Sequence, residues 1–332
     1  MNIKLSVISE NRTDLMGIAM LGVLIGHLVN LGGLDQSSFF VRGISIIPKI
    51  AFTQTFLFLS GLGIYNSLMK TSSLRQYYKK RLVRVFLPAV LILVPFNSVF
   101  LFHGQITVTE FISKSLFFSY WINGNDNGMW YISVALFLYA IAPLLIAFKS
   151  GKYVGWGAFL VLLIVIVFIT MSIINPQYFN NGFFFFGHAI AFPIGMYAMS
   201  RIESNGKKDY IHFFVYIFFC LLFFLSLRRL FEQASPFIGD ILKIVFAYIL
   251  GVALGLVRQL KPNFFGFSIL RYFGKYSLEI YILHMSFNLM LTSVLQIGAL
   301  WSIAISVVLS VLIAPLVSIF YKVIISNFMP GT

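Results

Sequence analysis

The stretch GIAMLGVLIGHLVNLGG, Gly17 to Gly33, decides the class of fold to which this chain belongs. It carries no charged side chain, and Arg12 and Asp14 stand just before it. A helix of about 20 predominantly apolar residues is long enough to cross the hydrocarbon core of a bilayer. The sequence therefore predicts a membrane-spanning helix that holds one imidazole, that of His27, well inside it.

The composition extends this prediction to the whole chain. Of the 332 residues, 59% are hydrophobic and 10% are charged, whereas an average soluble domain has about 25% charged residues. We expect an all-α, polytopic membrane helix bundle in which residues 1–332 form a single integral membrane domain. About ten spanning helices are expected, near residues 13–31, 44–69, 82–102, 128–148, 154–174, 182–200, 210–227, 237–257, 273–296 and 299–326. The longest connection, 103–127, is expected to be a loop, because NGNDNG is rich in turn-forming residues.

The basic residues predict the orientation of the bundle. The net charge is +14, and most Lys and Arg side chains fall in connections that alternate helices would place on one side. Because cytoplasmic loops carry the excess of Lys and Arg, both termini are expected in the cytoplasm. No nucleic-acid partner is needed to explain this charge. The first apolar stretch is expected to remain as a helix, since no cleavage signal is evident, and the single cysteine, Cys220, excludes an intrachain disulfide.

The longest basic run is YYKKRLVRVFLP, Tyr77 to Pro88. One interpretation is an anchor that fixes topology, which the positive-inside rule requires. The other is a phosphate site, because the planar guanidinium of Arg grips phosphate bidentately and stays charged. Arg81 and Arg84 are three residues apart and would share a face of a helix, with Lys80 beside them.

His27 has two interpretations. An ionisable side chain inside a span is costly, so it is expected either to face a functional interior or to bond neutrally to a neighbouring helix. In an ideal helix, Arg12 would lie about 60° round from His27 and roughly 22 Å below it. A ligand held by its phosphates at the inner rim would extend along this face to the imidazole.

Five segments in order resemble the acyltransferase 3 family of membrane acyltransferases. NRTDLMGIAMLGVLIGHL is similar to the opening helix of the family, and TFLFLSGLGIYNSL to its second helix. YYKKRLVRVFLP, NGMWYISVALFLYAIAPLL and FGKYSLEIYILHMSF resemble the basic entry to the third helix, a Trp-containing helix and a late Tyr- and His-containing segment. The likeness covers residues 12 to about 287.

The resemblance implies a function and assigns roles to residues. The family transfers an acyl group, commonly acetyl from cytoplasmic acetyl-CoA, to hydroxyls of cell-surface glycans or similar acceptors. His27 would be the catalytic base, and Arg81, Arg84, Lys80 and Arg12 would hold coenzyme A. The expected partners are acyl-CoA, a polysaccharide or lipid-linked saccharide acceptor and membrane lipids of the plasma membrane, with no metal.

The chain departs from the family pattern at one position. Met16 stands eleven residues before His27, where the family usually has a basic residue. Either Arg12 takes over that role, or the donor binds differently, or the chain is an inactive member.

Other residues are candidates for the acceptor site. Trp130, Tyr131 and Asn127 would bind the acceptor, although interfacial aromatic residues and a turn explain them equally. His284 either contacts the acceptor or makes a structural hydrogen bond. Ser60 and Gly61 are small, and they predict a close approach of helices. A hydroxyl that lines a cavity is the alternative for Ser60.

The rival class is a secondary transporter or flippase. In that class His27, together with the intramembrane groups His188, Glu279, Asp240 and Lys243, would form an ion path. Transporters often contain internal repeats, and the sequence shows none clearly. A regulatory subunit without catalysis is the third class, and a substitution at His27 distinguishes it from an enzyme.

Overall fold

The computed structural model describes residues 6–35, 37–44, 52–71, 73–123, 128–149, 189, 191–203, 249–250, 253–255, 257–258, 260–261 and 263–328. Over these ranges the chain forms helices and no strand. Three of the described helices are long and apolar enough to cross a membrane: Arg12–Leu31, Leu74–Phe102 and Ala299–Asn327. A shorter apolar helix covers Trp130–Ile146. The described part of the protein is therefore helical, and it contains helices that can cross a bilayer.

The chain divides into two compact units that interleave along the sequence. Unit 1 contains Met1–Val23, Ile46–Asn66 and Phe186–Lys275. Unit 2 contains Leu24–Ser45, Ser67–Phe185 and Tyr276–Thr332.

Unit 1 is held together by close approaches of helix backbones. Helix α4 (Phe52–Met69) packs its first part against α12 (Ala191–Glu203). A Cβ added at Gly61 would lie 2.1 Å from the carbonyl oxygen of Phe192, and one at Gly195 would lie 2.0 Å from that of Phe58. Only glycine permits such an approach, and small residues at helix interfaces are typical of membrane bundles. The close approach predicted at Gly61 is confirmed.

The same packing joins the start of the first long helix to a late one. Helix α2 (Arg12–Leu31) follows the short α1 (Ser6–Glu10), and α15 (Gly266–Lys275) packs against its first turns. A Cβ at Gly17 would lie 2.0 Å from the carbonyl oxygen of Leu270, and one at Gly274 would lie 1.8 Å from that of Thr13. Residues more than 250 positions apart in the chain thus bring their backbones together.

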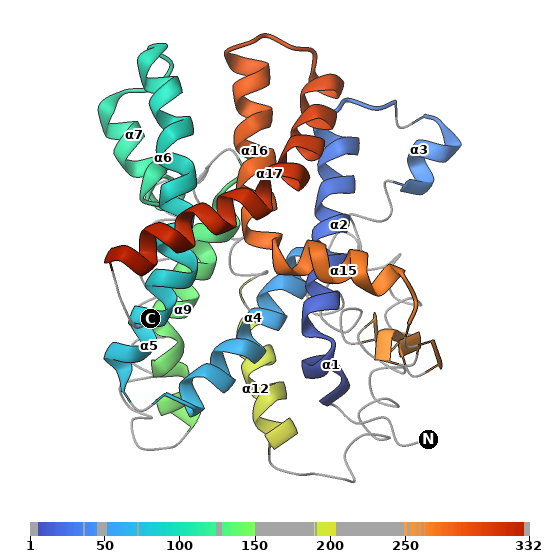
Figure 1. The fold of residues 1–332 in the computed structure, drawn as a ribbon, viewed down its shortest axis with the longest axis vertical. Coiled ribbons are helices and arrows are strands. Elements are labelled where there is room, and N and C mark those ends of the chain that lie inside the picture. Colours follow the sequence, from blue (N-terminus) through green and yellow to red (C-terminus); the bar gives the residue numbers. More distant parts are fainter. Residues whose placement is uncertain are drawn as a thin grey trace, which may run out of the picture. The chain divides into compact units, whose positions relative to one another are not determined.

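Unit 2 is organised around α16 (Ser277–Ser293), which Figure 1 shows beside α17. Its further helices are α3 (Phe39–Ile44), α5 (Leu74–Arg81), η2 (Leu82–Phe86), α6 (Leu87–Phe102), α7 (Val108–Ser115), α8 (Ser119–Asn123), α9 (Trp130–Lys149) and α17 (Ala299–Phe328). Helix α16 packs against α17 and α6, and α6 packs against α7. The middle of α16 is almost wholly buried, from Glu279 to Ser286.

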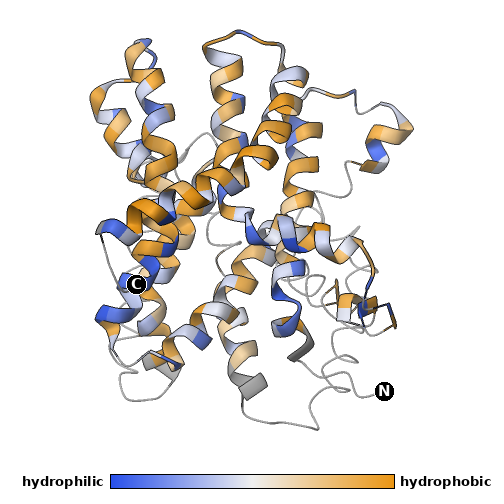
Figure 2. Ribbon diagram, viewed as in Figure 1, coloured by the Kyte–Doolittle hydropathy of each residue, from blue (hydrophilic) through white to orange (hydrophobic). Residues whose placement is uncertain are grey.

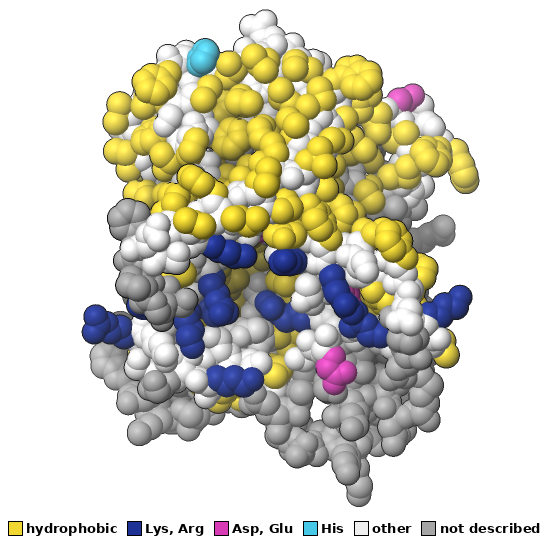
Figure 3. Space-filling view, viewed as in Figure 1, with side chains coloured by type: hydrophobic (Ala, Val, Ile, Leu, Met, Phe, Trp, Pro, Cys, Tyr) yellow, Lys and Arg dark blue, Asp and Glu magenta, His cyan; other side chains and the backbone are white. Residues whose placement is uncertain are grey.

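The exposed face of α17 is apolar, as expected for a helix in contact with lipid. Figure 2 shows this helix mostly in hydrophobic colours, and Figure 3 shows hydrophobic side chains gathered over it. Its most exposed side chains are large and apolar, and include Trp301, Leu312, Leu316 and Phe320 at 64–69% exposure. Such an uninterrupted apolar face is stable in a bilayer rather than in water.

Several predicted spans coincide with helices, and others differ at their ends. Those expected at 13–31, 128–148 and 299–326 correspond to α2, α9 and α17. The third begins earlier than 82, at Leu74, because the Ser73 side chain accepts a hydrogen bond from the Gln76 backbone and caps the helix. The span expected at 273–296 is interrupted at Tyr276, whose φ of −105° and ψ of 18° separate α15 from α16. Of the span expected at 44–69, α4 covers the part from Phe52, and α12 covers the end of that expected at 182–200. The spans expected at 154–174 and 210–227, and most of 237–257, lie outside the described residues.

The connection expected to be a loop contains helices. Helix α7 begins after Thr107 with a capping box, in which the Thr107 side chain accepts from the Glu110 backbone and the Glu110 carboxylate accepts from the Thr107 backbone. The loop prediction for 103–127 was therefore wrong for Val108–Ser115 and Ser119–Asn123. The sequence TVTE carries the signal, since Thr followed three residues later by Glu is the pattern of a helix start.

Candidate active site

Two histidines from distant parts of the chain form a pair within unit 2. Nδ1 of His27, on α2, lies 2.8 Å from Nε2 of His284, on α16. The two rings are stacked, with centroids 5.1 Å apart and planes 24° from parallel. His284 is fully buried, whereas His27 is only partly buried. The His27 ring is thus turned against another helix of the bundle.

The hydrogen bonds of this pair fix which nitrogen carries each proton. Nδ1 of His284 lies 2.8 Å from the carbonyl oxygen of Ile280, one helical turn earlier. A carbonyl only accepts, so His284 Nδ1 donates, and in a neutral ring Nε2 must then accept. His27 Nδ1 is the donor in the pair, and the lone pair of His27 lies on Nε2. Among the described residues, no group makes a hydrogen bond to that nitrogen. A neutral imidazole with a free lone pair on one ring nitrogen can accept a proton.

A series of aromatic rings in contact, the aromatic ladder, connects this pair to the residues expected to bind the acceptor. Ring centroids are 6.2 Å apart for Trp130 and Tyr131, 5.6 Å for Tyr131 and Tyr281, and 5.8 Å for Tyr281 and His284. The structure therefore brings Trp130, Tyr131 and His284 together with His27. Asn127 lies outside the described residues.

The segment before α9 is fastened to α16. The Tyr281 hydroxyl donates to the carbonyl oxygen of Gly128. Gly128 has a φ of +91°, in the region that favours glycine, and a Cβ there would meet the side chain of Met285 at 2.2 Å. This junction sets the position of Trp130 and Tyr131 at the start of α9.

The basic residues expected to bind coenzyme A have different surroundings. Arg81, the last residue of α5, is half-buried: its Nη2 donates to the Ser67 hydroxyl at 3.1 Å and its guanidinium lies 5.8 Å from the Tyr77 ring centre. Its Nε is buried without a hydrogen-bond partner. Arg84 lies in the π-helical turn η2 and is exposed, and Lys80 is partly exposed. The π-helical turn is wider than an α-helical turn, so Arg81 and Arg84 have different surroundings, although the sequence predicts that they share one face of a helix.

Arg12 lies in unit 1 and is held by α4. Its Nε donates to the carbonyl oxygen of Leu59 at 2.9 Å. Its guanidinium rests on Gly63, where an added Cβ would be 2.9 Å from Nη2. The structure thus positions Arg12 through main-chain contacts.

Asp14, two residues after Arg12, is the centre of an ion-pair cluster that the sequence analysis did not predict. It is buried, pairs with Arg258 and lies 3.6 Å from Arg271. Arg258 also donates to the Asn11 side chain and stacks on Phe267, with 4.8 Å from its guanidinium carbon to the ring centre. No local spacing signals these contacts, because the partners are more than 240 residues apart. The cluster fixes the start of α2 in unit 1.

Within the described part of the chain, no group of three or more His, Cys, Asp or Glu side chains is close enough to hold a metal ion.

Apolar helices and histidines paired inside them define an integral membrane protein of the helical class. The chain belongs to the acyltransferase 3 family: the family model, described as an acyltransferase domain, matches residues 15–321. The protein is an acyltransferase, and the resemblance in the five segments is confirmed over nearly the whole chain. Neither the comparison with curated proteins nor that with solved structures gave a match.

Proposed function

We propose that this acyltransferase transfers an acetyl group from cytoplasmic acetyl-CoA to a hydroxyl of a cell-surface polysaccharide or its lipid-linked precursor. In this proposal it crosses the plasma membrane several times, with both termini in the cytoplasm. The observation that carries the proposal is the hydrogen-bond chain from Ile280 through His284 to His27. It leaves Nε2 of His27 with a free lone pair that can accept a proton.

The reaction needs one proton acceptor and one proton donor, and His27 serves as both. Nε2 removes the proton of the acceptor hydroxyl as its oxygen attacks the thioester carbonyl carbon. The carbon–sulfur bond then breaks, and the departing thiolate takes the proton back from His27. The products are an ester and free coenzyme A, and the imidazole returns to its starting state.

His284 acts in this proposal as a positioning residue. Both its nitrogens are engaged, by Ile280 and by His27, and its side chain is fully buried. It therefore holds the tautomer and direction of the base, as a partner on the second ring nitrogen commonly does. This role replaces the acceptor contact that the sequence left open for His284.

Coenzyme A would be held by its phosphates at the basic residues. The buried and unpartnered Nε of Arg81 is a donor that a phosphate oxygen would satisfy. Arg84 and Lys80, in the same stretch, present further positive charge. Arg12 is a further candidate for a contact with coenzyme A, because the family pattern has a basic residue where this chain has Met16.

Thioester turnover tests the proposal directly. The purified protein in lipid nanodiscs is incubated with acetyl-CoA, and free thiol is measured in the presence and absence of candidate saccharides. His27→Ala is expected to lower turnover about 10²- to 10⁴-fold, the usual effect of a general base. His103→Ala is the matched control, because His103 is exposed at the end of α6 and bonds only to its own helix at Val99. Equal turnover in wild type and His27→Ala would disprove the role of His27.

A further inference from the structure

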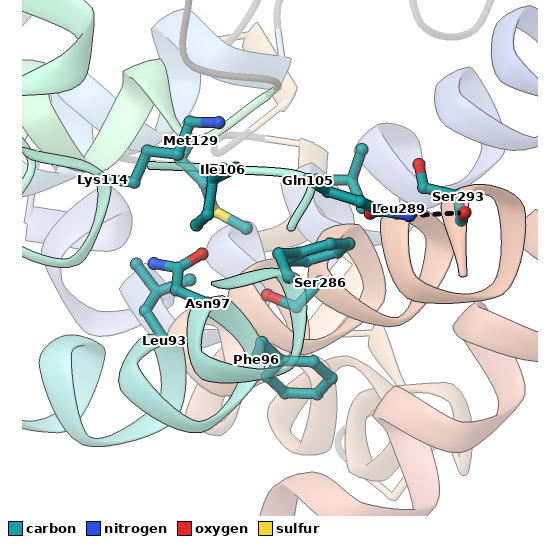
Figure 4. Close-up of a pocket in the computed structure, with 11 residues that line it drawn as sticks. Leu93, Phe96, Asn97, Gln105, Ile106, Lys114, Met129, Ser286, Leu289 and Ser293 are labelled. Carbon is teal, nitrogen blue, oxygen red and sulfur yellow. Dashed lines mark hydrogen bonds between the residues drawn. The ribbon is translucent and has the colours of Figure 1, made fainter. Parts of the chain in front are cut away.

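A cavity with several polar groups in its lining lies in unit 2, away from the histidine pair. Its volume is about 340 Å³, and it is enclosed by α6, the following connection, α7 and α16. Figure 4 shows Asn97 from α6 and Ser286 from α16 entering it from opposite sides. Lys114 of α7 and the rings of Phe96 and Phe100 complete the part of the lining that matters here.

The polar groups of this cavity lack sufficient partners within the protein. The Ser286 hydroxyl is 3% exposed and makes no hydrogen bond. Asn97 uses its Nδ2 to donate to Ser115 at 3.0 Å, and Gln105 uses its Nε2 to donate to the carbonyl oxygen of Ser293 at 2.8 Å. Their amide oxygens are left as acceptors. A buried hydroxyl without a partner is costly, so a ligand that bonds to Ser286 would be stabilised.

The charge in the cavity is positive. Within the described part of the chain, no carboxylate forms an ion pair with Lys114. Glu110, one turn earlier in α7, makes capping-box bonds with Thr107 and attracts Lys114 electrostatically without forming an ion pair with it. The ammonium group is thus available to an anion.

The cavity is separate from the histidine pair but shares a wall with the aromatic ladder. Ser286 and His284 are two residues apart on α16, about 200° round the helix, and so face opposite ways. Met129 lines the cavity, whereas the next residues, Trp130 and Tyr131, belong to the ladder that leads to His284. A chain-like ligand passing along residues 128–131 would reach both places.

We propose that this cavity binds a saccharide unit that carries an anionic group, a carboxylate or a phosphate. Its volume is near the lower end of the range for ligand sites, about 300–1,000 Å³, which suits one small unit. The phenyl rings offer apolar surface to a sugar ring, the two amide oxygens and Ser286 match its hydroxyls, and Lys114 pairs with its charge. The inference rests on the proposed function in one respect: the saccharide is then a remote unit of the acceptor.

Direct binding tests this assignment without relying on turnover. Saturation-transfer NMR measures the binding of methyl glucuronide and of the neutral methyl glucoside to the full chain in zwitterionic nanodiscs. The glucuronide is expected to bind about tenfold more tightly than the glucoside, as for a hydrogen bond to a charged group. Lys114→Met should abolish that preference, and Ser286→Ala should weaken both sugars. Lys70→Met, at an exposed lysine outside the cavity, should change neither.

Four results would overturn the assignment. The first two are equal binding of the two sugars and a preference that survives Lys114→Met. The third is displacement of the glucuronide by phosphatidylglycerol in the nanodisc, which would assign the cavity to a lipid headgroup. Displacement by millimolar inorganic phosphate alone, without any effect of Ser286→Ala, would likewise count against a saccharide. Glucuronide binding that depends on Lys114, together with unchanged turnover in His27→Ala, would leave the cavity assigned and refute the proposed function instead.

Discussion

Replacing His284 by alanine removes the acceptor that fixes the tautomer of His27. In the wild type, His27 Nδ1 donates to His284 Nε2 at 2.8 Å, and His284 Nδ1 donates to the carbonyl oxygen of Ile280. Without His284, the proton of His27 is free to move to Nε2, the nitrogen that acts as the base in the proposed mechanism. We therefore expect His284→Ala to impair catalysis although His284 touches neither substrate.

The size of the effect follows from the lost hydrogen bond. Leaving a buried donor such as His27 Nδ1 without its partner costs about 1–3 kcal/mol. At about 1.4 kcal/mol for each factor of ten, turnover should fall roughly 5- to 150-fold. His27→Ala should fall further, about 10²- to 10⁴-fold, because the base itself is removed. The double variant should be no slower than His27→Ala, since His284 acts only through His27.

The assay is acetyl-CoA turnover by the wild type, both single variants and the double variant, each first shown by thermal unfolding to be folded. His284→Gln provides the conservative control, because a side-chain amide oxygen can still accept from His27 Nδ1, and it should recover part of the activity lost in His284→Ala. Losses that multiply in the double variant would show that His284 acts independently of His27 and would refute the reasoning.

Three further predictions follow from local geometry. Gly61→Ala places a Cβ 2.1 Å from a carbonyl oxygen of α12, so it should destabilise the protein by about 1–3 kcal/mol and lower its unfolding temperature. Gly43→Ala is the control, because Gly43 has open space around it, and it should not lower the unfolding temperature. In Gly63→Ala, the added Cβ would lie 2.9 Å from the flexible end of Arg12 and would displace it. The KM for acetyl-CoA should therefore rise several-fold, whereas the unfolding temperature should stay nearly unchanged. An unaltered KM would argue against a contact between Arg12 and acetyl-CoA. Hydrogen bonds from Thr107 lower the pKa of Glu110, so protection of the α7 amides from hydrogen exchange should be complete at neutral pH and decline as the pH falls through that lowered pKa. Glu110→Gln should remove this pH dependence, and an identical decline in that variant would contradict the assignment.

Much of the fold and the position of one candidate residue, His27, can be predicted from the sequence because they depend on local patterns. The apolar run after Gly17 predicts α2 and the position of His27 within it, since hydropathy and helix length are properties of a single segment. The start of α7 can also be predicted from a local pattern, because TVTE is the sequence of a capping box, although our sequence analysis expects a loop there.

What joins these segments was decided by packing. His27 and His284 are 257 residues apart, and Tyr281 bonds to Gly128 across 153 residues. No spacing in the chain encodes these distances, because they arise when two helices pack and each turns a particular face to the other. By itself, the sequence determined that a histidine stands inside an apolar helix. Only the tertiary structure decided which group its Nδ1 bonds to, and hence which of its nitrogens keeps a free lone pair.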